Sequence, residues 1–319
     1  MGDRCPGQVR EATHSSASAV HFLTSFNRKL VYALPRHMSS ATRPNSIDTG
    51  DKPSEQLFTL GARLSSVAAL ASFLLVLWQV ISQTPLPGKP GWPESLLIIT
   101  LTLTTLTSLA RQLPGQNALL AATIIGVIGA IAHGVGAATA IPFGPFAYTD
   151  DSGPRLFNTL SWSVPALWII IVLNSRGVAR LILRPWRKLK NYGFWLIGIT
   201  TVLVLLFDLA MEPFAARAYH YWLWLPTTFP VTWYGMPLTN SLGWLVTTLL
   251  LLVLATPPLI SKQSRSRKTQ PAFQPLVVWL LGLTLFATGA ITHQLWLAAG
   301  FCVVTGIAAT IFALRGARW

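Results

Sequence analysis

The stretch GFWLIGITTVLVLLFDLAME, Gly193 to Glu212, decides the fold. It carries no charged side chain before Asp208, and its length matches the roughly 20 apolar residues with which a helix crosses a bilayer. The whole chain has the same character, because 52% of its 319 residues are hydrophobic and only 11% are charged. Soluble domains rarely show this composition. The sequence therefore predicts an all-α integral membrane protein.

The same length criterion, applied outward from this stretch, predicts a bundle of about eight transmembrane helices. The predicted spans cover residues 61–82, 94–112, 116–137, 157–175, 193–212, 238–260, 275–292 and 295–314. A count of seven is the alternative, because only THQLW (292–296) separates the last two spans. Residues 1–60 form a polar tail that we expect to be disordered, and residues 61–319 form the membrane domain.

The basic residues predict the orientation of the bundle, because cytoplasmic loops collect Lys and Arg. They gather in the N-terminal tail, after the fourth and sixth spans and at the C-terminus, whereas the alternate loops hold only Lys89, Arg155 and Arg217. Both termini are therefore predicted to be cytoplasmic. The net charge of +14 is spread over these loops and forms no single basic patch, so no nucleic-acid partner is expected. Cys5 and Cys302 lie at opposite ends of the chain and predict neither a disulfide framework nor a metal site.

Asp208 and Glu212 are the acidic residues of the fifth predicted span. Their spacing of four puts both carboxyls on one face of a helix, about 5–6 Å apart at Cβ. An acid inside a membrane span is costly and by default marks a functional site. Two such groups do not readily ionise together, so one is expected to stay protonated near neutral pH and to act as a general acid.

A structural role is the alternative for this pair. Glu212 would then reach the membrane interface where Pro213 ends the span. Asp208 would pair with Arg217, Arg155 or a histidine. In either role, the two acids are the first residues to test.

The loop FGPFAYTDDSGPRLF, Phe143 to Phe157, is predicted to close the outer end of a pocket. A rigid apolar loop at membrane depth is tolerated where it is buried in protein or lines a cavity. Asp150 and Asp151 in this loop are expected to form a turn or to cap the fourth span. A catalytic role is the alternative for Asp150, as a reserve acid.

Three further polar or small-residue features are ambiguous in the sequence. His133 lies late in the third span. Its two candidate roles are a proton relay and a hydrogen-bonded packing residue. Gly134 and Gly136 beside it are expected to permit close helix packing. Asn240 lies at the beginning of the sixth span. Its two candidate roles are an amide donor to a site and a part of the helix start.

No phosphate loop, dinucleotide fingerprint, zinc-ligand cluster or serine nucleophile motif occurs in the sequence. The chemistry must therefore be of a kind that carboxyl groups and a dry pocket perform alone. Protonation of an alkene fits, with a tertiary carbocation captured by water or by an internal double bond. Aromatic faces stabilise cations, and Trp168 and Tyr234 lie near the outer segments, although most such residues belong to the interfacial belt.

Four stretches in order, IPFGPFAYTDDSGPRLF (141–157), VPALW (164–168), DLAMEP (208–213) and YGMPLTNSLGWL (234–245), resemble one family. This is the membrane carotenoid 1,2-hydratases, the family of bisanhydrobacterioruberin hydratase and γ-carotene 1'-hydroxylase, and the resemblance covers about residues 130–260. It implies addition of water across the terminal C1=C2 double bond of an acyclic carotenoid ψ-end, without an organic cofactor. It also implies a lipophilic substrate such as lycopene or γ-carotene, a bilayer location in the bacterial inner membrane, and other carotenoid enzymes as candidate partners.

The resemblance and the residues together predict a site near the outer leaflet. The expected catalytic residues are Asp208 and Glu212, with Asp150 in reserve, and no metal is expected. The expected substrate-binding residues are Phe143, Phe146, Tyr148, Asp151, His133, Trp168, Tyr234 and Asn240. The chain departs from the family pattern at His133, where an acid is expected, at Glu212, where Asp is expected, and at Ala140, where Gly is expected.

Three rival functions stay open on the sequence. A carotenoid end-group cyclase or isomerase uses the same protonation but excludes water. A proton-coupled small-solute transporter would use the intramembrane acids and His133, although no inverted repeat is visible. A non-catalytic carotenoid-binding subunit is the third, and it predicts that neither acid affects turnover.

Overall fold

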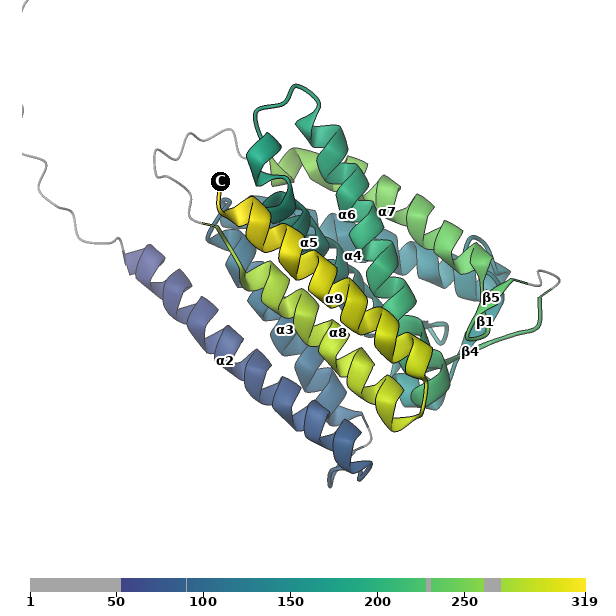
Figure 1. Ribbon diagram of the computed structural model, residues 1–319. Helices are drawn as coiled ribbons and strands as arrows, with labels where there is room; N and C mark the ends of the chain where they lie inside the picture. The colour runs from purple at the N-terminus through teal and green to yellow at the C-terminus, as the bar shows by residue number, and fades with distance from the viewer. Residues whose placement is uncertain (1–52, 90, 228–230, 261–270) are drawn as a thin grey trace, which may run out of the picture. The chain divides into compact units, whose positions relative to one another are not determined.

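The computed structural model describes residues 53–89, 91–227, 231–260 and 271–319. Eight helices in this part of the chain are long and apolar enough to cross a membrane (Figure 1), which confirms the predicted count. They are α2 (Pro53–Ser82), α3 (Trp92–Ala110), α4 (Gly115–Thr139), α5 (Val164–Ile182), α6 (Tyr192–Glu212), α7 (Leu238–Leu259), α8 (Gln274–Thr292) and α9 (Trp296–Ala317). Residues 1–52 of the predicted polar tail lie outside the described residues, and residues 53–60 form the first turns of α2.

Short paired strands lie in the loops at one end of the bundle (Figure 1). The segment after α4 contains β1 (Phe146–Tyr148), β2 (Arg155–Leu156) and β3 (Leu160–Ser161), and the segment after α6 contains β4 (Trp222–Trp224), β5 (Thr232–Trp233) and β6 (Met236–Pro237). Strands β1 and β4 pair antiparallel, with Phe146 opposite Trp224 and Tyr148 opposite Trp222. This pairing joins two loops that are far apart in the sequence.

The fourth span begins at Val164, so the predicted start at residue 157 is wrong. Phe157 and Asn158 have positive φ angles of 52° and 58° and lie between the paired strands β2 and β3. A left-handed backbone cannot continue a right-handed helix, and α5 starts only where Pro165 occupies its first turn. Asp150 and Asp151 form a 3₁₀ turn, which confirms the turn and not the cap among the two expected roles, because the N-cap of α5 is Ser163.

The predicted end of the fifth span, just before Pro213, is the second boundary that the structure corrects. The α-helical part ends at Glu212, and a π-helical segment continues from Pro213 to Ala218. Proline has no N–H to donate and its ring crowds the preceding turn. The wider π turn accommodates both effects, and such segments occur frequently at functional sites. Glu212 therefore lies inside the bundle and not at its edge.

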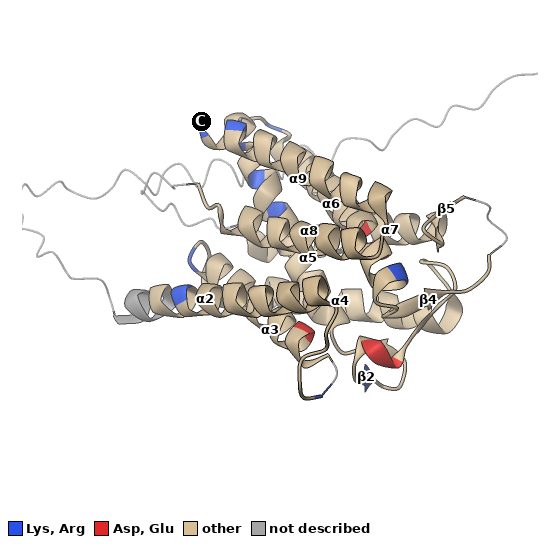
Figure 2. Ribbon diagram, turned by 60° about the horizontal axis from the view of Figure 1, so that its bottom comes forward, with Lys and Arg blue, Asp and Glu red and all other residues tan. Residues whose placement is uncertain are grey.

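Charged residues separate along the bundle axis (Figure 2). Most of the Lys and Arg in the described part lie at the end that carries the C-terminus, and the Asp and Glu lie toward the end that carries the short strands. This separation is consistent with the alternation of basic loops in the sequence. The basic run KQSRSRK, residues 262–268, lies outside the described residues.

Helix α5 occupies the centre of the bundle and contacts α3, α4, α6, α8 and α9. Its contact with α9 depends on Gly316, because a Cβ there would lie 2.1 Å from the carbonyl oxygen of Leu181. We expect Gly316→Ala to push α9 from α5 and to lower stability by about 1–3 kcal/mol, the usual cost of overpacking. The midpoint of thermal unfolding in detergent measures the effect.

Gly300 on the same helix provides the matched control. A Cβ at Gly300 meets no atom within 4 Å, and Ala is the better helix former by roughly 0.5–1 kcal/mol. Gly300→Ala should therefore leave the unfolding midpoint unchanged or raise it slightly. Equal losses in the two variants would contradict the close α5–α9 contact.

Candidate functional site

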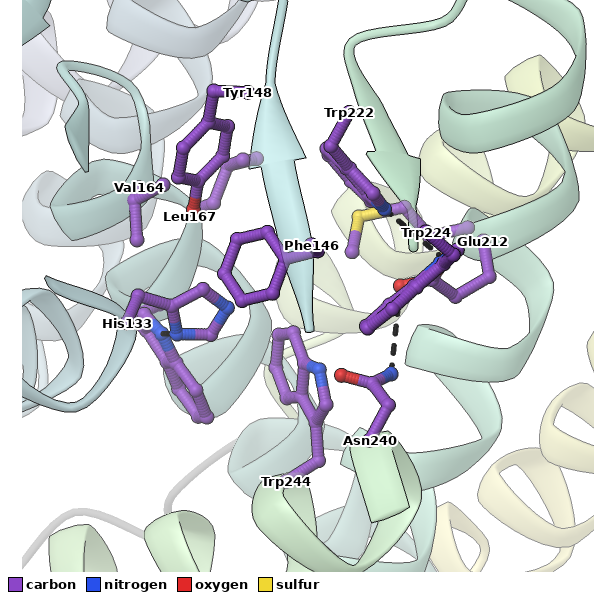
Figure 3. Close-up of a pocket in the computed structure, with 12 residues that line it drawn as sticks. His133, Phe146, Tyr148, Val164, Leu167, Glu212, Trp222, Trp224, Asn240 and Trp244 are labelled. Carbon is purple, nitrogen blue, oxygen red and sulfur yellow. Dashed lines mark hydrogen bonds between the residues drawn. The ribbon is translucent and has the colours of Figure 1, made fainter. Parts of the chain in front are cut away.

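The paired loops and four helices enclose a small cavity, which we call the first cavity (Figure 3). Its volume is about 40 Å³, which exceeds the roughly 10–15 Å³ that one buried water requires. Half of its lining residues are Phe, Tyr or Trp, namely Phe146, Tyr148, Trp168, Trp222, Trp224 and Trp244. Its polar lining groups include Glu212, Asn240 and His133. The cavity can thus hold water or a small branched hydrocarbon tip among ring faces.

Asp208 and Glu212 share one face of α6, as their spacing predicts. They are 0% and 3% exposed, and the side-chain nitrogen of Asn240 lies 3.2 Å from Asp208 Oδ2 and 3.4 Å from Glu212 Oε1. The amide N–H₂ of Asn240 therefore donates to both carboxyl groups. The sequence left two roles open for Asn240, and these hydrogen bonds support the role of amide donor.

Arg217 and Arg155, the two arginines considered as ion-pair partners of Asp208, bond to other groups. Arg217 donates through Nε to the backbone oxygen of Tyr234 at 2.6 Å. Arg155 donates to Asp150 Oδ1 at 3.0 Å and to the backbone oxygen of Tyr148 at 2.9 Å. Neither is the partner of Asp208, so the buried acids are not held by an ion pair with either arginine.

Of the two acids, only Glu212 lines the first cavity. Its Oε2 accepts hydrogen bonds from the indole N–H groups of Trp222, at 3.2 Å, and Trp224, at 3.0 Å (Figure 3). Asp208 lies behind it, and within the described residues its Oδ1 is buried without a hydrogen-bond partner. Glu212 is therefore the carboxyl that lines the first cavity, and Asp208 is connected to it through Asn240.

Ring faces form the rest of the wall. Trp168 and Trp244 stack with ring centroids 4.2 Å apart and an interplanar angle of 26°. Trp168 packs directly against the backbone of α4, because a Cβ at Gly129 would lie 2.4 Å from its ring. Aromatic faces attract a cation within about 6 Å of the ring centroid. The wall is suited to a transient positive charge.

His133 is held at the opposite side of the first cavity from Glu212 (Figure 3). Its Nδ1 accepts a hydrogen bond from Trp168 Nε1 at 3.1 Å, and its ring lies 4.2 Å from that of Phe143. These contacts support the packing role over a proton relay. The family resemblance implies an acid at this position, and the imidazole nitrogen accepts the tryptophan N–H as a carboxylate oxygen would.

Tyr148 lies on the same side as His133 (Figure 3). Burial, and next the charge of Glu212, raise the pKa of its phenol. The hydroxyl therefore stays protonated over the physiological pH range and is available as a hydrogen-bond donor to water in the cavity.

A second cavity of about 360 Å³ adjoins the first, and its size lies within the roughly 300–1,000 Å³ of ligand sites. It is lined mainly by apolar side chains of α2, α3, α5, α6 and α8. The side chains that line both cavities are Tyr148, Val164, Leu167, Met211 and Trp222. The two spaces adjoin at these side chains.

The structure brings most of the predicted site residues together. Six of them line the first cavity, namely His133, Phe146, Tyr148, Trp168, Glu212 and Asn240. Phe143 is fully buried behind this wall, against His133 and against glycines 136 and 243. Gly136 is thus required for a close contact, although with a ring and not with a helix, whereas Gly134 has no close neighbour.

Three predicted site residues lie elsewhere. The hydroxyl of Tyr234 accepts a hydrogen bond from the backbone N–H of Ala298 at 3.3 Å, so this residue packs at the start of α9. The Asp150 side chain is fully exposed and bonded to Arg155. Asp151 borders the second cavity together with Asp150, and neither lines the cavity of Glu212.

The residues that the sequence interpretation missed are Trp222, Trp224 and Trp244. Most aromatic residues near the outer segments were expected to belong to the interfacial belt, and Trp222 and Trp224 are two of them. Their alternation in WLW is nevertheless a signal, because residues two apart in a strand point to one face. Trp244 lies one helical turn after Asn240, a spacing that places both on one face of α7.

Comparison with known proteins agrees with this geometry. Residues 94–309 match the family described as carotenoid biosynthesis protein. A stretch of 112 residues, 35% of the chain, is 31% identical to bisanhydrobacterioruberin hydratase of Haloarcula japonica, and it spans 36% of the length of that protein. No solved structure matches the chain. The family match covers most of the membrane bundle and includes every residue that lines the first cavity, so this chain belongs to the carotenoid biosynthesis protein family.

Proposed function

We propose that this protein is a carotenoid hydratase, which adds water across the terminal C1=C2 double bond of an acyclic ψ-end. The observation that carries the proposal is the buried carboxyl of Glu212, which faces a water-sized cavity walled by aromatic rings. The name of the Haloarcula japonica relative supports the same reaction. Lycopene, γ-carotene and related acyclic carotenoids are the substrate class.

Glu212 acts as the acid and then as the base. Its protonated carboxyl transfers the proton to C2, which leaves a tertiary cation at C1. A water molecule attacks C1 and returns one proton to Glu212, so that one water is added and the carboxyl is regenerated. Asp208, one helical turn away and joined through Asn240, favours the protonated form of Glu212 because two adjacent buried charges repel. The reaction needs no cofactor.

The aromatic wall lowers the energy of the intermediate. A cation that is shielded from water gains up to about 2 kcal/mol from a single ring face, which corresponds to a rate factor of roughly 30. Phe146 and Trp244 line the space between Glu212 and His133 (Figure 3), and Trp168 lines the same cavity. The same rings exclude bulk water, so only the water held in the cavity reaches C1.

The proposed location is a bacterial inner membrane, with the strand-bearing end of the bundle outward and both termini in the cytoplasm. The distribution of Lys and Arg supports this orientation. We infer that a polar tail precedes α2 and that the polyene enters from the lipid.

Expression in a host that accumulates lycopene or γ-carotene tests the proposal. We expect a new pigment whose mass exceeds that of the substrate by one water, detected by chromatography and mass spectrometry. The host with an empty vector provides the control. A new pigment of unchanged mass would indicate cyclisation or isomerisation and would overturn hydration.

A further inference from the structure

The second cavity has a polar mouth at the strand-bearing end of the bundle. Gln79 of α2 donates through Nε2 to Glu94 Oε1 of α3 at 2.8 Å, and both residues line the cavity. Within the described part of the chain, the remaining oxygens, Gln79 Oε1 and Glu94 Oε2, are buried without a hydrogen-bond partner. An unsatisfied buried acceptor costs about 1–3 kcal/mol. Two of them at a cavity mouth point to a ligand that brings a donor.

Below the mouth, the cavity runs into the apolar interior. On α8 its lining extends from Phe286 to Val278, a distance of about 12 Å at 1.5 Å per residue. Phe73 and Leu101 line it from α2 and α3. The space therefore suits an apolar chain that carries a polar group at one end.

The charge around the mouth selects the kind of polar group. Glu94, Asp150 and Asp151 all line the cavity, and the Arg155 side chain is bonded to Asp150. Burial, and next the charge of Glu94, raise the pKa of Tyr221, so this neighbouring phenol stays neutral and remains a hydrogen-bond donor. Acidic surroundings repel a phosphate or a diphosphate, whereas a neutral hydroxyl can donate to Glu94 Oε2.

We propose that the second cavity binds an isoprenoid alcohol, with its hydroxyl donating to the Gln79–Glu94 pair and its chain along the apolar walls. The identity of this alcohol rests on the proposed function, in which it is the hydroxylated end of the product. The two cavities share the side chains of Met211 and Trp222. The tertiary alcohol formed at Glu212 therefore moves past these side chains into a site that satisfies its hydroxyl, which clears the first cavity for the next substrate.

Ligand retention by the full-length protein, purified in detergent, tests this site without turnover. The probes are a C20 isoprenoid alcohol, the hydrocarbon with the same carbon skeleton and the diphosphate ester of the alcohol, each followed by native mass spectrometry. We expect the wild-type protein to retain the alcohol at least tenfold better than either other probe. Glu94→Leu should lower retention of the alcohol at least tenfold and remove the preference for the alcohol over the hydrocarbon.

Matched variants distinguish the contribution of the apolar cavity to binding from the contribution of the polar mouth. Leu281→Trp fills the cavity from α8 and should lower retention of the alcohol. Val277→Trp places the same ring on the outer face of that helix, where Val277 is 52% exposed, and should leave retention unchanged. Gln79→Leu tests the hydroxyl site if Glu94→Leu does not accumulate.

The outcomes distinguish this site from the proposed reaction. Asp208→Asn should bind the alcohol as the wild type does, even if it forms no product. Equal retention of alcohol and hydrocarbon by the wild type would overturn the proposal. Unchanged alcohol retention in the mouth variants would also overturn it, and so would retention of the diphosphate equal to that of the alcohol.

Discussion

Replacing Glu212 by Gln is expected to reduce formation of the hydrated carotenoid at least 100-fold. The amide matches the carboxyl in size, and its carbonyl oxygen can still accept from Trp222 and Trp224. It has no acidic proton to deliver to C2, and general acid catalysis typically contributes 10²–10⁴-fold. The measurement is hydrated pigment per amount of membrane-inserted protein in the lycopene-accumulating host.

Thr201→Val on the same helix is the control for this variant. Thr201 is buried, and its hydroxyl donates only within α6, to the backbone oxygen of Ile197. The substitution preserves side-chain shape, so product formation should match the wild type. Normal product from Glu212→Gln would exclude this carboxyl as the proton donor and move the assignment to another group in the first cavity.

Asp208→Asn is expected to lower product formation at neutral pH by 10- to 100-fold, with partial recovery at lower pH. Asp208 does not line the first cavity, so we assign it a positioning role that acts on Glu212. Without the neighbouring negative charge, Glu212 loses its proton more readily. The active, protonated fraction then falls at neutral pH and rises again as the pH is lowered.

A pH profile of hydration in isolated membranes measures this effect. Wild-type membranes and the Thr201→Val variant provide the reference profiles. A purely structural role for Asp208 predicts the same fractional loss at every pH, together with a lower unfolding midpoint. Such a flat loss would exclude the proton-coupling role and leave Glu212 as an isolated acid.

The count of eight spans could be predicted because a span is a local property. A run of about 20 apolar residues must form a helix in lipid, whatever lies beside it. The wrong boundary at residue 157 depends on a strand pairing, whereas the one at Pro213 depends on whether a wider helical turn accommodates the proline. The β2–β3 pairing holds Phe157 and Asn158 in a left-handed backbone, and the wider turn after Glu212 continues the helix through the proline.

The acid pair could be predicted for a similar reason, because the i, i+4 spacing determines which residues share a helix face. Assigning different roles to the two acids required the tertiary structure. The β1–β4 pairing brings Trp222 and Trp224 to Glu212, and no local pattern connects them with it. The same long-range packing directs Tyr234 toward α9 and away from the site.

By itself, the sequence determined the membrane class, the number of spans and the two acids that share a face, since hydropathy and helical periodicity are set by neighbouring residues. Only the tertiary structure decided that Glu212 faces the first cavity while Asp208 lies behind it, and that a second cavity with a polar mouth adjoins the site. The physical reason is that a cavity is bounded by side chains from many elements, whose contacts depend on how the helices and paired loops pack together.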